Sequence, residues 1–478
     1  MKPDSKLDVE VGYIGGGNAL LIFRHGRSIA AQDFVKKWSR EVLLQFPGIV
    51  PAAVIREFKP TDTQVNADNL NKLFRELSIT KNQMVPITEL PRYGITTDCV
   101  QSGLSAEVFD SDINVQKWVS SVSKAKINNA AKKINNDFES PDEKDVLDSI
   151  AGKSYRFTHT EEKMGQLESQ NHIAVVHIDG NSMGHQFQEC ENLSERKKLS
   201  LAVENRTREA WEFMIESLMK NIVDLEKDGI INPMKSEDKK YDLLPVRKLI
   251  LNGDDLTFVC NAQLAFWLTE IFLEKLTRSA LTFQNADMMN SENKPIYISA
   301  CAGIAIVKTK FPFYRAYELA EDLCRNAKEI GREKKESWFD FEIVYGGVSG
   351  GLKNIRKKKY PRGQETLRRP WRLFNKFGKK GTGTNSDWSS LKNALKEFNR
   401  KNNGRPIWPR SKQKELLQMI TRGEQSFQDY AGILLAGGTK LPNLPVDNEK
   451  TKIQFFYDSL QAIEFYSNFL LEGGNSHA

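Results

Sequence analysis

Residues 249–259 read LILNGDDLTFV, and this stretch decides the fold. Two short apolar runs flank an Asn-Gly-Asp-Asp turn. The pattern predicts a β-hairpin, because Gly accepts positive φ and Asx side chains hydrogen-bond their own backbone. A solvated hairpin tip would account for the turn, but it does not require two adjacent carboxylates. A divalent cation does, since Mg²⁺ prefers carboxylate oxygens together with phosphate oxygens. The hairpin is therefore a candidate metal site if a third acid reaches Asp254 and Asp255.

A third acid follows another apolar run. IAVVHI, from Ile173, is continuous and β-rich, as in a strand covered on both faces, and it ends at Asp179 in HIDGNSMG. Taken alone, this motif is equally well explained by a strand that runs into an Asx-turn. The pattern from residue 173 to 344 predicts the order β-α-β-β-α-β-α-β, which is typical of a ferredoxin-like palm. In that fold the first strand lies beside the hairpin, so the three acids would surround two metal ions roughly 3.5–4 Å apart.

Length and composition bound the class of protein. The chain has 478 residues, 40% hydrophobic and 27% charged, which allows two or three domains. We divide it into residues 1–110, 111–170, 171–345 and 346–478. The five cysteines form no CxxC pair, which argues against a zinc site or a disulfide framework and suits a reducing cytoplasm. The start lacks an apolar signal-peptide core, and Glu270 and Glu274 interrupt the most apolar helical stretch, so we expect no membrane association.

Three motifs in this order resemble the palm domains of nucleotide cyclases. They are HIDGNSMG, NGDD and the helical segment AKEIGREKK. The relatives are the large polymerase-like subunit of type III CRISPR complexes and the diguanylate cyclases with the GGDEF signature. The resemblance covers about residues 171–344. In the CRISPR polymerases the turn reads GGDD, and here Asn252 stands at the first glycine. Asn tolerates left-handed backbone geometry better than most residues, so we expect the turn to survive.

The resemblance implies a role for each matching residue. Asp179, with the backbone carbonyl of Gly180, would bind metal, while Asp254 and Asp255 would complete the metal site or deprotonate the attacking hydroxyl. The residues implied to approach the nucleotide are Gly180, Asn181, Ser182, Met183, Gly184, Asn252, Gly253, Lys328 and Arg332. The last two lie four residues apart, so both cations would reach one triphosphate tail. A solvated basic helix end is the alternative interpretation of that pair.

The N-terminal segment VGYIGGGNALLIF repeats the strand, Gly-rich turn, strand layout. A helix over about 30–45, a strand at IVPAAVIREF and a helix over about 66–77 complete the second half of a palm as an internal repeat. The turn residues Gly15, Gly16, Gly17 and Asn18 stand where carboxylates would be. We therefore predict a degenerate first palm without a catalytic metal, whose turn amides hold the phosphates of a second nucleotide. The predicted fold class is α/β, with two ferredoxin-like palm modules and a mostly helical C-terminal domain.

The family implies phosphoryl transfer with two Mg²⁺ or Mn²⁺ ions. The predicted activity is that of a nucleotidyltransferase that makes a cyclic or linear oligonucleotide second messenger from ATP or another NTP in antiviral defence. No histidine is followed by Asp, so an HD nuclease motif is absent from the sequence. The alternative is a non-catalytic palm scaffold, or a nucleotide-sensing subunit of an RNA-guided complex. Complex subunits or a second copy of the chain are the protein partners we expect.

One segment concentrates positive charge. Residues 351–380 carry twelve Lys or Arg and one acid, Glu365, with aromatic residues around Trp371. This mixture suits RNA or another anionic partner. We expect an activating RNA or small ligand to bind over residues 353–380, with Arg356, Lys357, Lys358 and Lys359 as contacts. A solvated linker is the alternative interpretation.

Overall fold

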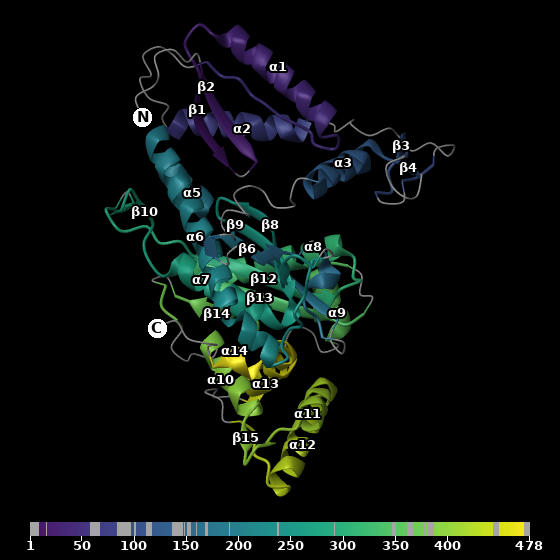
Figure 1. Cartoon of the computed structure of the whole chain (residues 1–478). Helices are drawn as coiled ribbons and strands as arrows, with labels where there is room; N and C mark the ends of the chain where they lie inside the picture. The colour runs from purple at the N-terminus through teal and green to yellow at the C-terminus, as the bar shows by residue number, and fades with distance from the viewer. Residues whose placement is uncertain are drawn as a thin grey trace. The chain divides into compact units, whose positions relative to one another are not determined.

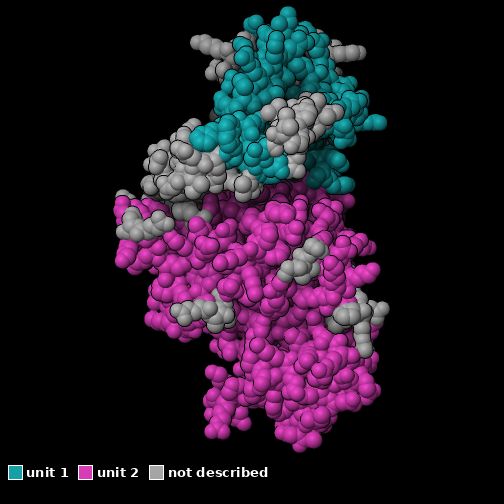
Figure 2. Space-filling view, turned by 90° about the vertical axis from the view of Figure 1, so that its right-hand side faces the viewer, with its two compact units in different colours: residues 1–142, 184–200 teal, residues 143–183, 201–478 magenta. Residues whose placement is uncertain are grey.

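The computed structural model describes residues 9–15, 17–57, 67–83, 97–99, 102–110, 117–135, 147, 149–150, 154–158, 160–167, 171–190, 192–236, 239–290, 292–346, 350–360, 367–375, 378–380, 387–442 and 449–472. The chain forms two compact units, coloured separately in Figure 2. Unit 1 consists of residues 1–142 and 184–200, and unit 2 of residues 143–183 and 201–478. The four-segment division predicted from the sequence stays a prediction.

Unit 1 is built around an antiparallel hairpin and two helices (Figure 1). Strands β1 (Val9–Gly15) and β2 (Asn18–Phe23) pair, and helices α1 (Ser28–Gln45) and α2 (Ala67–Gln83) follow. The strand predicted at IVPAAVIREF is wrong over residues 49–57, which are not in a strand. Pro51 lacks the N–H that a ladder needs, and among the described residues β1 and β2 pair only with each other. The other described elements are β3 (Val108–Asp110), β4 (Lys117–Val119), α3 (Ser121–Asn135) and most of α5 (Met183–Glu189).

Unit 2 contains a six-stranded sheet in the order β14-β13-β12-β6-β9-β8. Its strands are β6 (His172–Gly180), β8 (Val246–Asn252), β9 (Asp255–Asn261), β12 (Ala300–Lys308), β13 (Ser337–Val344) and β14 (Trp371–Phe374). The helices between them are α6 (Leu193–Lys227), whose first turns belong to unit 1, α7 (Ala265–Thr277) and α8 (Phe313–Lys334). The predicted strand and helix order of the palm is confirmed.

Each face of the sheet is covered by helices, which explains why the strands are apolar throughout. On one face the buried side chains of β6 and β12 pack against α8, and Gly303 permits the closest approach, because a Cβ there would lie 1.9 Å from the carbonyl oxygen of Ala320. On the other face Phe266 of α7 packs edge-on against Phe341 of β13, with ring centroids 5.0 Å apart. The sheet is thus a fixed platform for whatever its strand ends carry.

The C-terminal part is mostly helical, as predicted, but it begins by extending the palm. Strand β14 pairs antiparallel with β13, a pairing that the sequence did not reveal. The helices are α9 (Leu352–Lys359), α10 (Trp388–Phe398), α11 (Arg410–Arg422), α12 (Glu424–Ala436), α13 (Glu449–Ala462) and α14 (Asn468–Leu471). The short strands of unit 2 are β5 (Tyr155–Phe157), β7 (Asp242–Leu244), β10 (Thr282–Phe283), β11 (Ala286–Asp287), β15 (Lys401–Asn402) and β16 (Arg405–Pro406). Within the described parts of the chain, every helix is too short or too polar to cross a membrane.

Candidate metal centre

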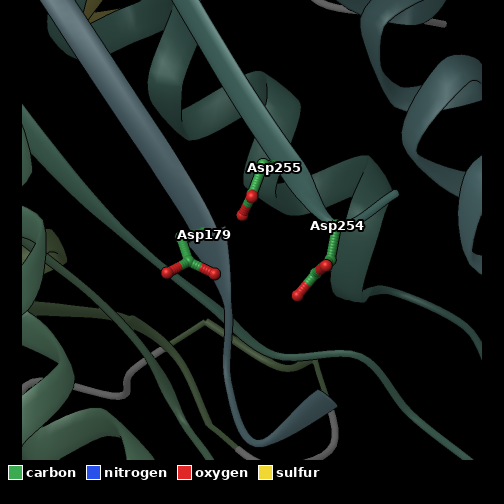
Figure 3. A group of neighbouring side chains, drawn as sticks. All are labelled: Asp179, Asp254 and Asp255. Carbon is green, nitrogen blue, oxygen red and sulfur yellow. The ribbon is translucent and has the colours of Figure 1, made fainter. Parts of the chain in front are cut away.

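The three predicted acids meet at one end of the central strands. Strand β6 pairs antiparallel with β9, with Ile178 opposite Leu256, so the end of β6 lies beside the β8–β9 turn. One carboxylate oxygen from each of Asp179, Asp254 and Asp255 lies within 4.8 Å of the other two. Figure 3 shows these side chains close together, with Asp179 on β6, Asp254 on the β8–β9 turn and Asp255 at the start of β9. We call these three residues the acidic triad.

The β8–β9 turn has two central residues, Gly253 and Asp254. Asn252 pairs with Asp255, and Gly253 has φ of 62°, so the turn has positive φ at its first central position, as type II′ turns do. The left-handed residue is therefore Gly253, whereas Asn252 ends β8 in an ordinary strand position. The glycine that the polymerase motif has at position 252 is not needed for the backbone of this turn.

Gly180 is required by the packing of the triad. A Cβ at this position would lie 2.4 Å from Oδ2 of Asp254 and 2.8 Å from its Cβ, both far inside van der Waals contact. Only a residue without a side chain lets the Asp254 carboxylate stand over the end of β6. The sequence resemblance assigned Gly180 through its carbonyl oxygen, and the geometry adds this steric role.

The triad is electrostatically unsatisfied. Burial, followed by the charge of Asp179, raises the pKa of Asp254. The same two causes, with a hydrogen bond to Asp179, raise the pKa of Asp255 from 3.8 to about 8. Like charges held together in a partly buried place disfavour ionisation, so the metal-free triad retains a proton at neutral pH. Added positive charge would relieve this repulsion.

Lys328 and Arg332 share a helix face but have different surroundings. Lys328 is 5% exposed and forms an ion pair with Oδ2 of Asp179. Arg332, one turn further along α8, is exposed. A solvated helix end therefore does not describe Lys328, which contacts the triad through Asp179, while it does describe the surroundings of Arg332.

Residues 181–184, which follow Asp179, alternate between buried and exposed positions. Asn181 is 4% exposed, and its Nδ2 donates to the carbonyl oxygen of Glu336 at 2.9 Å and to Oγ of Ser299 at 3.1 Å. Its amide therefore anchors the loop after Asp179 to the residues that directly precede β12 and β13. Ser182 is exposed with φ of 56°, and Met183 is buried. Gly184, also predicted at the triphosphate, is exposed and belongs to unit 1.

The Gly-rich turn of unit 1 has the predicted hairpin form. Gly15 pairs with Asn18, and Gly17 has φ of 69°. Oδ1 of Asn18 accepts a hydrogen bond from Nζ of Lys81 at 3.2 Å. Gly16 lies outside the described residues. The turn carries amide groups and no carboxylate, so its predicted role in binding phosphate without a metal stays a prediction.

Part of the basic segment 351–380 is buried in ion pairs, whereas the sequence predicted a surface for an anionic partner. Arg356 is 2% exposed and pairs with Asp340 at 2.7 Å, and Lys359 pairs with Glu342 at 2.7 Å. Arg369 likewise pairs with the buried Asp458. Arg356 is therefore wrong as a contact for an anionic partner. Although burial alone would raise it, the surrounding Lys359, Arg369 and Arg356 hold the pKa of Glu342 at about 2.

A sequence signal for this ion network was available. Strand β13 reads SWFDFEIV, and acids alternate with large apolar residues in a strand that is otherwise fully buried. Buried carboxylates need paired cations, so a nearby cluster of Lys and Arg is their expected source. Lys353, Lys357 and Lys358 remain exposed on α9.

Comparison with known proteins gives one family model, the Cas10/Cmr2 second palm domain, which matches residues 172–337. No curated protein matches the chain. The crystal structure of Csm1 from T. onnurineus has 12% identity and a TM-score of 0.48 over 96% of this chain and 62% of that chain. A Csm1–Csm4 cassette in complex with cA4 has 11% identity and a TM-score of 0.48, over 95% and 62%. The GGDEF domain of YfiN from Pseudomonas aeruginosa has 12% identity and a TM-score of 0.21, over 37% and 84%. The chain thus spans less than two thirds of the Csm1 chains.

Proposed function

From the match of residues 172–337 to the Cas10/Cmr2 second palm domain, we propose that the chain is a nucleotidyltransferase. It joins nucleoside triphosphates, with ATP as the first choice, into a cyclic or linear oligonucleotide. The observation that carries the proposal is the acidic triad, whose three carboxylates converge within 4.8 Å at the strand ends of a palm. Neither a core nor a turn requires three acids at that point.

The donor set fits hard divalent cations. Mg²⁺ and Mn²⁺ take oxygen ligands, and here three carboxylates and the carbonyl oxygen of Gly180 are the candidate ligands. The geometry at Gly180 supports this fit, because the missing Cβ leaves the Asp254 carboxylate room beside the end of β6. When bound, a pair of such ions would neutralise the charge that develops on the transferred phosphoryl group and on the attacking and leaving oxygens.

The chain's own residues would hold the reactants in line. Asp254 or Asp255 accepts the proton of the attacking ribose hydroxyl. Lys328 and Arg332, four residues apart on α8, bind the triphosphate tail. The exposed Ser182 and the Gly253 turn border the same strand end and supply polar groups to the phosphates. Pyrophosphate then leaves toward the cations of α8.

A second nucleotide must supply the hydroxyl. The amides of the Gly15–Asn18 turn are our candidate for binding its phosphates without a metal. The product would act as a second messenger in antiviral defence. The chain would act in a complex with other subunits or as a homodimer, under the control of an activating ligand.

Incubation of the chain with labelled ATP and Mg²⁺ or Mn²⁺, followed by chromatography of the products, tests the proposal. The parent protein should form an oligonucleotide, and the double variant Asp254→Asn, Asp255→Asn should form none while retaining its thermal unfolding transition. All four NTPs are tested, with and without candidate RNA activators. An equal product yield from the double variant, or no product under any of these conditions, would contradict the proposed activity.

A palm scaffold or a nucleotide sensor is the second candidate. The observation that favours it is the incomplete first module, in which residues 49–57 form no strand beside the β1–β2 hairpin. Equilibrium dialysis with ATP separates the candidates. A sensor binds ATP and returns it unchanged, a scaffold copurifies with partner subunits or RNA and binds no nucleotide, and the enzyme consumes ATP.

A further inference from the structure

Lys328 occupies an unusual place for a residue that binds phosphate. Its side chain is 6% exposed and lies against Oδ2 of Asp179, one of the three carboxylates of the acidic triad. Lys328 also contributes favourable charge at both other members of the triad. Within the described residues it is the one cation that forms an ion pair with any of the three acids. The ammonium group therefore contacts a carboxylate oxygen that a metal ion bound at Asp179 would also use.

An ammonium group and a divalent cation compete for the same carboxylate. Each needs direct contact with the oxygens of Asp179, and the two cations repel one another at such separations. We propose that Lys328 is the resident counter-ion of the metal-free triad, and that a divalent cation binds Asp179 only after displacing it. The inference rests on the proposed function, because it concerns the order of events at the same metal centre.

The displaced Lys328 side chain can form a new ion pair with the bound nucleotide. A four-carbon stem with a single charged end can swing without disturbing the helix that carries it. The triphosphate tail of a nucleotide is an anion that can accept Lys328 when the metal takes its place at Asp179. Binding free energies are reciprocal, so a triphosphate that holds Lys328 away from Asp179 strengthens metal binding, and metal strengthens triphosphate binding. Lys328 would thus make the centre assemble as one unit.

The proposal predicts the sign of a measurable effect. In the absence of nucleotide, Lys328→Met should bind Mn²⁺ more tightly than the parent, by about tenfold, because the competing cation is gone. A residue that merely supports the site would change affinity in the opposite direction. Lys328→Arg keeps the charge and should not raise the affinity. Lys334→Met removes an exposed cation from the same helix and should leave Mn²⁺ affinity unchanged.

Titration of free Mn²⁺ by electron paramagnetic resonance measures this directly, with the full chain and Mn²⁺ alone. Thermal unfolding in chelator and in excess Mn²⁺ provides a second readout. Without its lysine the triad is more repulsive, so Lys328→Met should unfold at a lower temperature in chelator and should gain more from Mn²⁺ than the parent does.

Asp254→Asn separates the possible failures. If this variant loses Mn²⁺ binding and Lys328→Met binds Mn²⁺ as weakly as the parent or more weakly, the exchange is refuted and the metal centre stands. If Asp254→Asn binds Mn²⁺ as the parent does, the metal centre fails, and the proposed function and the exchange fail with it. Tighter binding by Lys328→Met, lost again when Asp254→Asn is added, supports the exchange.

Discussion

Gly180→Ala is the smallest change that should disable the metal centre. The added Cβ would lie 2.4 Å from Oδ2, 2.8 Å from Cβ and 3.0 Å from Cγ of Asp254. Ordinary contacts between such atoms begin near 3.4 Å, as for any packed Cβ. Oδ2 of Asp254 must therefore retreat by about 1 Å and its Cβ by about 0.6 Å, so rotation of the carboxylate alone cannot relieve the clash.

A displacement of this size is large compared with metal coordination. Bonds from Mg²⁺ to oxygen are about 2.0–2.1 Å long and tolerate little variation, so a ligand displaced by 1 Å is a lost ligand. Misplacing a reacting group by about 1 Å costs on the order of 10²-fold in rate. We expect Gly180→Ala to lower Mn²⁺ affinity at least tenfold and nucleotide synthesis about a hundredfold. The fold should persist, since the clash is with a side chain at a turn.

Mn²⁺ titration, the labelled-ATP assay and thermal unfolding measure these effects on one preparation. Gly346→Ala is the matched control, because it adds a methyl group where no atom lies within 4 Å. A Gly180→Ala variant that binds Mn²⁺ and consumes ATP like the control would show that Asp254 does not have to stand over the end of β6. In that case Asp254 would not be a metal ligand.

Three further predictions concern charge and packing. Because the pKa of Asp255 is raised to about 8, the free energy of unfolding of the metal-free protein should fall as pH rises from 4 to 8. The Mn²⁺ affinity, measured calorimetrically, should rise about tenfold per pH unit from pH 6 to 8 and then level off, because the metal needs the ionised carboxylate. Arg356→Met should lower the free energy of unfolding in urea by about 3–5 kcal/mol, whereas the exposed Lys357→Met should change it by less than about 0.5 kcal/mol. Gly303→Ala should lower the unfolding temperature, because its Cβ would overlap the carbonyl of Ala320; equal stability to the parent would contradict the α8 packing.

The triad could be predicted because each of its parts is local. A continuous apolar strand that ends in Asp179 and a two-residue turn with Asp254 are patterns of under ten residues. The palm topology then needed one long-range pairing, β6 with β9, and the observed ladder contains it. Local signals and a common topology were sufficient for the acids, although they did not reveal why position 180 must be glycine.

Side-chain direction could not be predicted in the same way. Helical spacing places Lys328 and Arg332 on one face, but the sheet beneath α8 decides that only Lys328 is buried against Asp179. The family resemblance assigned Asn181 to the nucleotide, yet its side-chain amide donates to the carbonyl oxygen of Glu336, 155 residues away. Strand β14 was missed for a related reason, since its pairing with β13 depends on a non-local partner and its own sequence is only four residues long.

The buried acids of β13 and the half-buried acidic triad of the same palm differ in how their charge is balanced, and the contrast supports a metal centre. The acids of β13 are compensated by Arg356, Lys359 and Arg369, so the pKa of Glu342 lies near 2. In the acidic triad, burial and then the charge of Asp179 raise the pKa of Asp255 to about 8, and among the described residues only Lys328 forms an ion pair with any of the three carboxylates. The chain therefore can provide counter-ions for buried acids, and it does so on β13, two strands from β6 in the same sheet. A triad that needs a retained proton and a single lysine to balance three carboxylates is costly for a fold, and a divalent cation would supply the missing positive charge.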